Sequence, residues 1–214
     1  MSEDREQSLP AADGAAAAPA AAPGALLRTR AWSTTDLSLV ATFAAVIAVG
    51  SLVAVPVSGV PVPVTLQTFA VLLAGAVLGA RRGSLAVLLY LAVGLAGLPI
   101  FAQGFGGPAV VGRASAGYLL AFPVAAWLIG AVAERSARRG WGVRTGSLVA
   151  GGVLASLVVY AVGVPVLAAR AGMSLAEAVA FNNVFVPFDA VKLGLAVLVA
   201  TSVHRAFPDL LPRR

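Results

Sequence analysis

The sequence predicts an all-α membrane protein whose chain crosses the bilayer six times. Of its 214 residues, 59% are hydrophobic and only 11% are charged, whereas about 25% of the residues of an average soluble domain are charged. The apolar residues form long continuous blocks rather than the one-sided stripes of helices that face water. These blocks are therefore predicted to be membrane-spanning helices.

The first 35 residues belong to none of these blocks. They are rich in Ala, Pro and Gly and have almost no aliphatic bulk. A segment with so little apolar surface cannot offset the entropy lost on ordering, so we expect residues 1–35 to form a disordered cytoplasmic tail. The segment lacks the basic start and leucine-rich stretch of a signal peptide, so we expect the first spanning helix to remain as an anchor.

Six apolar blocks then define a membrane domain over residues 36–206, which a short cytoplasmic tail at 207–214 follows. A bilayer core about 30 Å thick needs roughly 20 apolar residues per helix, with a range of about 17 to 25. Two blocks are shorter than this, so we expect some helices to be kinked or to continue into the interface. The predicted spans are residues 37–55, 64–78, 84–98, 116–133, 147–169 and 187–203.

Three longer connections fall on one side of the bilayer in this arrangement. Residues 56–63 contain three prolines, which oppose a regular helix and favour a stiff, extended connection. Residues 104–115 form a second apolar loop. Residues 173–186 form a third loop, in which Ser174 and Glu177 have the spacing of a capping box, so we expect a short interfacial helix there.

The distribution of arginine predicts which way the helices run, because positive charge accumulates in cytoplasmic loops. Of the arginines near the apolar blocks, eleven fall on the side of the N-terminus and only two, Arg113 and Arg170, in the loops opposite. Five or seven spans would scatter these clusters over both faces, so the asymmetry supports six spans with both termini in the cytoplasm. The eleven are Arg28, Arg30, Arg81, Arg82, Arg135, Arg138, Arg139, Arg144, Arg205, Arg213 and Arg214.

The last block carries two ionisable residues, Asp189 and Lys192, the latter being the only lysine of the chain. Three residues apart on a helix, they share one face. An ionisable group in a spanning helix costs about 2.5 to 3.5 kcal/mol on insertion scales and usually faces a cavity, a partner or a ligand. The alternatives are a pair that neutralises itself and a lysine that extends to the interface. We favour ligand binding, because a self-satisfied pair explains no need for charge at this position.

Further candidate ligand contacts lie near the predicted loops. Arg113 and Tyr118 flank small residues that lead into the fourth predicted helix, where a ligand could approach the backbone and its exposed amides. The alternatives are an arginine bound to lipid phosphate and a tyrosine in the aromatic belt. Gln67, with Thr68 beside it, and Gln103 could bind a heterocycle, although such side chains more often join membrane helices to one another, at about 0.6 kcal/mol each.

Several activities lack the residues that they need. The chain has no cysteine, which excludes thiolate chemistry and disulfides. Lys192 is followed by Leu193, which does not fit a Walker A loop. His204 is the only histidine and ends the last block, so we expect an interfacial residue rather than a metal ligand or a protease base. The arginines sit at block edges rather than on one continuous face, so nucleic acid is not a predicted partner.

Four motifs resemble the BioY family, the biotin-binding S components of energy-coupling-factor (ECF) transporters. They are Pro-Val-Thr-Leu-Gln-Thr at 63–68, Tyr-Leu-Ala-Val-Gly-Leu-Ala-Gly-Leu-Pro-Ile-Phe at 90–101, Gly-Tyr-Leu at 117–119, and Pro-Phe-Asp at 187–189 with Lys192. The resemblance extends from about residue 36 to about residue 205. One departure is the stretch Gly-Arg-Ala-Ser-Ala-Gly-Tyr at 112–118, where the family commonly has Gly-Pro-Thr-Gly-Gly-Tyr.

The resemblance implies that the protein captures biotin from outside the cell, without a cofactor and without catalysis. It implies that Asp189, Lys192, Arg113 and Tyr118 contact the vitamin. Biotin suits these side chains, because its two ureido N–H groups need an acceptor and its ureido oxygen or valerate carboxylate needs a cation. Which cation meets which group stays open.

The resemblance also implies partners in the cytoplasmic membrane. Transport would be driven by a transmembrane coupling subunit (EcfT-like) and by separate ATPase subunits (EcfA-like). In the larger class an Ala-x-x-x-Ala pattern on the first helix contacts the coupling subunit, and Ala41 and Ala45 match it. Such small-xxx-small patterns, of which Gly75 and Gly79 form another, let helices approach closely.

Two other functions remain open. A membrane enzyme acting on a lipid or prenyl substrate would use Asp189 as a base and would need further acids, but Asp36, Glu134, Glu177 and Asp209 are scattered at helix ends. The second is a non-catalytic scaffold, or the same fold adapted to a different vitamin.

Overall fold

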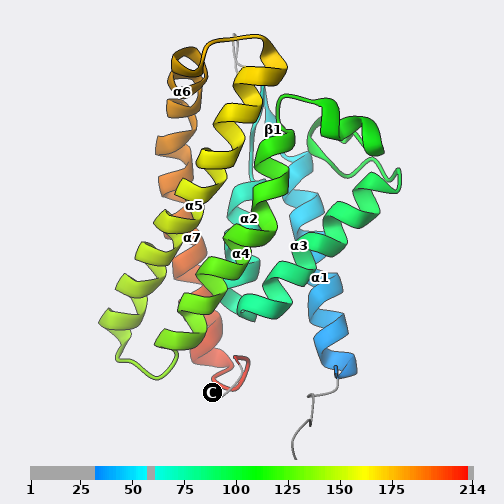
Figure 1. Ribbon diagram of the computed structural model, residues 1–214. Coiled ribbons are helices and arrows are strands. Elements are labelled where there is room, and N and C mark those ends of the chain that lie inside the picture. The colour runs from blue at the N-terminus through cyan, green and yellow to red at the C-terminus, as the bar shows by residue number, and fades with distance from the viewer. Residues whose placement is uncertain (1–31, 57–60, 212–214) are drawn as a thin grey trace, which may run out of the picture. The chain divides into compact units, whose positions relative to one another are not determined.

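The computed structural model describes residues 32–56 and 61–211, and this part of the chain is mostly helical (Figure 1). The chain divides into a unit of residues Met1–Trp32, nearly all of it outside the described residues, and a unit of Ser33–Arg214 that holds every element below. The predicted tail at 1–35 is thus described only from residue 32. The α-helices are α1 (Thr34–Leu52), α2 (Gln67–Leu78), α3 (Ala80–Leu95), α4 (Ala116–Ser136), α5 (Trp141–Ala171), α6 (Leu175–Asn183) and α7 (Phe185–Ala206).

Short elements complete the fold at one end of the bundle. The strands β1 (Ala54–Val55) and β2 (Val64–Thr65) form an antiparallel pair, and the 3-10 helices η1 (Ala102–Gly104) and η2 (Pro108–Gly112) lie between α3 and α4. We call this end, which also holds α6, the loop end. The opposite end, where α4 turns into α5 and the C-terminus lies, is the C-terminal end (Figure 1).

Each predicted span contains a helix, but only four of the described helices are long and apolar enough to cross a bilayer alone. These are α1, α4, α5 and α7. The α2 helix has 12 residues, which at 1.5 Å per residue gives about 18 Å, less than the hydrocarbon thickness of about 30 Å. The α3 helix has 16 residues. The second and third predicted spans are therefore the two that fall short.

The short α2 helix is surrounded by protein. Its residues from Ala70 to Leu78 are all buried, and it packs against α1, α3, α4 and α7. A backbone enclosed by neighbouring helices does not face lipid, so it can end before the bilayer does. Because Gly79 adopts φ 85°, a value that glycine tolerates, α2 can end there and α3 can begin at the next residue.

The C-terminal end is closed by tight packing and by polar contacts within the protein. A Cβ atom at Gly75 would lie 2.2 Å from the carbonyl oxygen of Ala126, so α2 and α4 touch through their backbones at this point. At the turn after Gly79, the Ala80 N–H donates to Glu134 Oε1 at 2.9 Å. The small-xxx-small pattern at Gly75 and Gly79 is confirmed as a place of close helix approach.

The first predicted connection begins earlier and ends later than the apolar blocks suggest. Residues 54–55 and 64–65, predicted as the ends of two spans, form strands instead, with Ala54 opposite Thr65 and Val55 opposite Val64. The neighbouring prolines cannot donate a backbone hydrogen bond, so the backbone groups beside them pair with each other rather than extend the helices. The extended backbone thus lies on both sides of the predicted connection at 56–63, of which residues 57–60 lie outside the described part.

The predicted short helix in the third connection is α6. The Ser174 hydroxyl accepts the Glu177 N–H at 3.2 Å, and the Glu177 carboxylate accepts the Ser174 N–H at 2.7 Å, which is the predicted capping box. Hydrogen bonds from the Ser174 side chain and backbone lower the pKa of Glu177 below its usual value. The α6 helix leads the chain back into α7.

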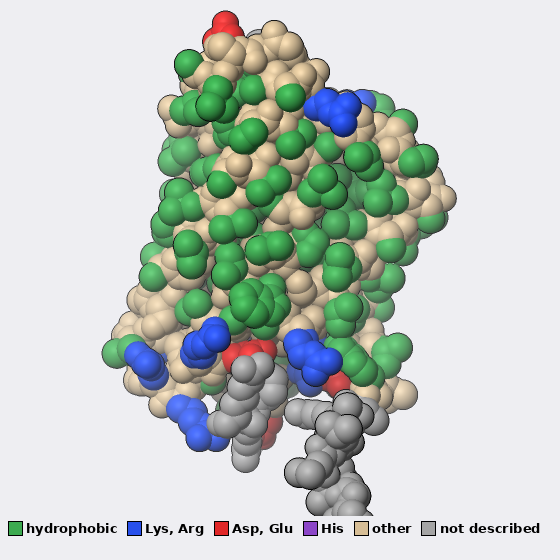
Figure 2. Space-filling model, viewed as in Figure 1, with side chains coloured by type: hydrophobic (Ala, Val, Ile, Leu, Met, Phe, Trp, Pro, Cys, Tyr) green, Lys and Arg blue, Asp and Glu red, His purple; other side chains and the backbone are tan. Residues whose placement is uncertain are grey.

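Most of the visible positive charge gathers at the C-terminal end, and a smaller group lies at the loop end (Figure 2). Arg82 pairs with Asp36 at 2.5 Å and donates to the Leu210 carbonyl at 2.8 Å. The Leu210 contact holds part of the predicted C-terminal tail, of which residues 212–214 lie outside the described part, against the bundle.

His204 lies in the last turn of α7, where it is predicted as an interfacial residue, and it is only 4% exposed. Its Nε2 atom lies 3.0 Å from the Val77 carbonyl, and its Nδ1 atom contacts the Arg144 guanidinium. The imidazole is therefore packed between helices rather than lying at the surface of the bundle.

Candidate ligand-binding site

A cavity lies between α2, α4, α5 and α7, beside the 3-10 helices of the loop end. Its volume is about 70 Å³. Much of its wall is apolar and aromatic, and a few polar side chains converge on one part of it, which is the usual composition of a small-molecule site. The aromatic residues of the wall are Phe101, Phe105, Tyr118, Phe122, Tyr160 and Phe185.

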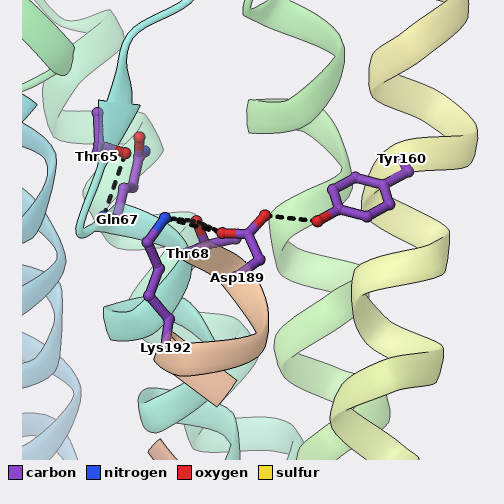
Figure 3. Close-up of polar contacts among 6 residues, drawn as sticks. All are labelled: Thr65, Gln67, Thr68, Tyr160, Asp189 and Lys192. Atoms are coloured by element: carbon purple, nitrogen blue, oxygen red, sulfur yellow. Dashed lines mark hydrogen bonds and ion pairs between the residues drawn. The ribbon is translucent and has the colours of Figure 1, made fainter. Parts of the chain in front are cut away.

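Asp189 is the centre of the polar part of the wall (Figure 3). Its Oδ1 atom lies 2.8 Å from Lys192 Nζ and accepts the Thr68 hydroxyl at 3.2 Å. Its Oδ2 atom accepts the Tyr160 hydroxyl at 2.6 Å. Three helices, α2, α5 and α7, thus meet on one carboxylate.

The local sequence explains how α7 presents the charged pair. Pro187 lies in the first turn of α7, where a backbone N–H would have no helical partner, so the helix continues through it. Asp189 and Lys192 then follow one turn apart on the face toward the cavity. Asp189 is 7% exposed and Lys192 is 6% exposed, so each depends on its partners in place of water.

The pair neutralises itself, as one alternative interpretation predicts, and it also lines the cavity. A carboxylate offers about four lone-pair positions and an ammonium has three donors. Asp189 receives three donors, from Lys192, Thr68 and Tyr160. Lys192 uses two of its hydrogens, toward Asp189 and, at 3.5 Å, Thr68. One acceptor and one donor position therefore remain for a bound ligand.

Two further predicted contacts line the cavity and are held in place from behind. The Tyr118 hydroxyl donates to Asn182 Oδ1 at 3.0 Å. The Gln67 amide donates to the Tyr90 hydroxyl at 2.9 Å. At the start of α2, the Gln67 N–H in turn donates to the Thr65 hydroxyl at 3.3 Å (Figure 3), which fixes the direction in which this helix begins.

Arg113 lies in the wall between η2 and α4. Its guanidinium carbon stands 3.6 Å from the centre of the Phe105 ring, a cation–π contact that leaves the N–H edges of the group available for a carboxylate. Gln103 does not line this cavity. It is exposed with a left-handed φ of 63° and faces an adjoining hollow that Arg113 also lines.

Five of the six predicted ligand contacts thus share one cavity: Asp189, Lys192, Arg113, Tyr118 and Gln67. Gln103 is the sixth and stands outside it. Ala41 and Ala45 lie elsewhere, one turn apart and both exposed on α1.

Two residues that hydrogen-bond to the predicted contacts are absent from the predicted set. Tyr160 donates the shortest hydrogen bond to Asp189, and Asn182 holds Tyr118. Tyr160 carried a usable signal, because it lies well inside α5 whereas tyrosines of the aromatic belt lie near helix ends. Asn182 ends α6 in an ordinary polar loop sequence, which gives no such signal.

Comparisons with known proteins point to one family. The family model described as the BioY family matches residues 25–209. The chain is 39% identical over 186 residues to the biotin transporter BioY of Rhizobium etli, covering 85% of this chain and 99% of that protein. It is 39% identical over 164 residues to the biotin transporter BioY of Thermotoga maritima, covering 76% of this chain and 92% of the relative.

A solved structure is similar as well. It is the S-component for biotin from an ECF-type ABC transporter, and it superposes with a TM-score of 0.73 at 28% sequence identity. The match covers 82% of this chain and 95% of that one.

Proposed function

The chain belongs to the BioY family, and from this premise we propose that it takes up biotin across the cell membrane as the S component of an ECF-type ABC transporter. The observation that carries the proposal is the buried Asp189 and Lys192 pair in the wall of a cavity. Relatives named as biotin transporters, and the similar S-component for biotin, support the choice of vitamin.

Electrostatics orients biotin in the proposed site. Asp189 repels a carboxylate and accepts N–H groups, so it favours the ureido ring, and the remaining donor of Lys192 suits the ureido oxygen. The valerate carboxylate then points away from Asp189. Arg113 is the cation of the wall that has no acidic partner within the described residues, so we assign the carboxylate to it.

The remaining contacts follow from this orientation. Tyr118 and the aromatic wall cover the fused rings, whose apolar faces gain from leaving water. Gln67 lies beside Thr68 at the polar part of the wall, within the region proposed for the ureido group. Gln103 lies outside the cavity and is not assigned a contact with biotin itself.

The proposal includes topology. We propose that α1, α2, α3, α4, α5 and α7 provide six crossings between residues 36 and 206, that both termini are cytoplasmic, and that residues 1–35 and 207–214 are cytoplasmic tails. Support comes from the arginines gathered at the C-terminal end (Figure 2) and from the rule that such charge stays inside.

The absence of cysteine from the sequence makes this topology simple to test. A single cysteine replaces either Arg170, in the last turn of α5, or Arg138, in the turn before α5, both of which are exposed. A membrane-impermeant maleimide applied to intact cells is expected to label Arg170→Cys and to label Arg138→Cys only after lysis. The reverse pattern would invert the proposed orientation.

The proposal assigns no catalysis to this chain. ATP hydrolysis is assigned to separate ATPase subunits, and the exposed small face at Ala41 and Ala45 on α1 to contact with the coupling subunit. Ala41→Trp is expected to keep biotin binding and to lose co-purification with the coupling subunit, because the bulky ring prevents close approach. Unchanged co-purification would remove α1 from that interface.

The ligand itself is tested by purification. The protein is extracted from cells in mild detergent, and small molecules released by denaturation are identified by mass spectrometry. Biotin is expected from the wild type, and Asp189→Asn serves as the matched control with reduced yield. A different vitamin would keep the transporter class and change the ligand, whereas a lipid or prenyl compound would favour the enzyme alternative.

A further inference from the structure

A second hollow adjoins the cavity at the loop end. Four residues line both spaces: Pro63, Ala102, Arg113 and Ser115. The second hollow has a volume of about 310 Å³, against about 70 Å³ for the cavity. A ligand held in the cavity therefore has room beyond the Arg113 side chain.

The second hollow carries positive charge that no acidic residue of its wall balances. Arg113 and Arg170 both line it, and the described residues of its wall include no Asp or Glu. Within the described residues Arg113 contacts the Phe105 ring, and Arg170 is exposed at the end of α5. Glu177, the acid that follows along the chain, is hydrogen-bonded to Ser174.

A recess lined by charge of one sign attracts and orients the opposite charge, and an arginine binds a carboxylate through two parallel hydrogen bonds. In the orientation proposed above, the valerate end of biotin lies at Arg113, at the junction of the two spaces. Any atoms attached to that end would enter the second hollow, toward Arg170.

We propose that this protein also binds biotin conjugates in which an amide bond joins the valerate group to an amino acid, with the amino-acid carboxylate held by Arg170. This inference rests on the proposed function. Conjugation makes the valerate group a neutral amide, whose carbonyl still accepts from Arg113. Its N–H donates to the Ser115 hydroxyl or the Gln103 side-chain carbonyl, both in the wall of the second hollow.

The test uses the full-length protein in nanodiscs of phosphatidylcholine, with competition against radiolabelled biotin. Three ligands are compared: biotin, biotin joined through an amide to glycine, and the neutral glycinamide conjugate. The variant is Arg170→Gln. Arg138→Gln is the matched control, since it removes an exposed arginine before the start of α5, about 45 Å away along a helix of 31 residues.

The glycine conjugate is expected to bind the wild type and to bind Arg170→Gln about three- to tenfold more weakly, the range for a partly exposed charged hydrogen bond. The affinities of biotin and the glycinamide conjugate for Arg170→Gln are expected to change less than twofold. Arg138→Gln is expected to bind all three ligands with the affinities of the wild type. Rejection of the glycine conjugate by the wild type, or equal affinity of both conjugates with no effect of Arg170→Gln, would overturn the inference.

Anionic lipid is the competing occupant of the second hollow. Repeating the measurement with phosphatidylglycerol in the nanodiscs distinguishes a lipid headgroup from the conjugate carboxylate as the occupant. If Arg170→Gln lowers lipid retention and leaves the affinity for the glycine conjugate unchanged, the hollow is a lipid site and the inference fails. If the wild type does not bind biotin, the proposed function fails, which is a separate result.

Discussion

The two ends of this bundle use buried charge in opposite ways. At the C-terminal end, the Asp36 carboxylate pairs with Arg82 and also accepts the Ser33 N–H, while Arg82 donates to the Leu210 carbonyl. Neither Asp36 nor Arg82 lines the cavity or the second hollow. At the loop end, the Asp189 and Lys192 side chains are each 8% exposed, less than those of Arg82 and Asp36, yet they form part of the cavity wall.

The difference shows that an ionisable residue in a membrane bundle is not by itself a sign of ligand binding. What distinguishes the two pairs is the space beside them: only the Asp189 and Lys192 pair lines the cavity. The helices separate around a cavity at the loop end and touch through glycine at the C-terminal end. Substitutions at the two ends should therefore separate binding from stability.

The largest expected effect is on binding, from Asp189→Asn. The variant keeps the size of the side chain but loses the charge that accepts a ureido N–H and balances Lys192. Biotin affinity is expected to fall by about 2 to 3 kcal/mol, or roughly 30- to 150-fold, as for a lost charged hydrogen bond. Titration calorimetry of the purified variant measures it.

A second substitution, Lys192→Ala, removes the other partner of the same pair. It is expected to weaken biotin binding by about 1 to 3 kcal/mol. The variant is still expected to insert into the membrane and to elute as a single species. Unchanged biotin affinity in both purified variants would refute the assignment of this cavity to biotin.

The largest expected effect on stability belongs to the other end, from Gly75→Ala. The added Cβ would overlap the Ala126 carbonyl oxygen, so α2 and α4 must move apart, at about 1 to 3 kcal/mol. The midpoint of thermal unfolding in detergent is expected to fall, while the biotin affinity of the folded fraction changes less than threefold.

Gly146→Ala is the matched control for Gly75→Ala, because a Cβ at Gly146 meets nothing within 4 Å. It is expected to leave stability unchanged or to raise it by up to about 1 kcal/mol, since alanine favours helix over glycine. Equal destabilisation by both variants would show that close packing at Gly75 is not the reason.

The sequence predicts the helical parts of this fold well and the contacts between them poorly. Long apolar blocks and the arginine asymmetry are local features, so every block contains a helix. The pairing of β1 with β2 depends on two segments that meet only in the folded chain. The short length of α2 likewise depends on enclosure by its neighbours, which hydropathy along the chain does not report.

The same division holds for the candidate site. Asp189 and Lys192 stand out in the sequence because charge is rare in spanning helices. Tyr160, 29 positions earlier, reaches the same carboxylate only because α5 and α7 pack together, and Thr68 does so from α2. Residues that converge from different helices are set by tertiary packing, which a single sequence does not display.

A smaller effect on binding is expected from Tyr160→Phe. The hydroxyl that donates to Asp189 Oδ2 is removed and the ring remains. Because Tyr160 acts on biotin only through Asp189, less than the full value of a charged hydrogen bond is lost, and biotin affinity is expected to fall about fivefold. In an Asp189→Asn background the same change is expected to have less effect, because the two residues act through one contact. Additive losses would mean that Tyr160 meets biotin directly.

The smallest effect on binding is expected from Asp36→Asn, which makes the same chemical change as Asp189→Asn at the other end. Asparagine keeps an oxygen that can accept the Ser33 N–H, and Arg82 keeps the Leu210 carbonyl. The Asp36 and Arg82 side chains are only 10% and 14% exposed, so the loss of stability is expected to be about 1 to 2 kcal/mol, as for a weakened charged hydrogen bond. Biotin affinity is expected to stay within twofold, since neither residue lines the cavity. A loss of binding comparable to that of Asp189→Asn would show that the two ends are coupled and that the charge at Asp36 serves the site.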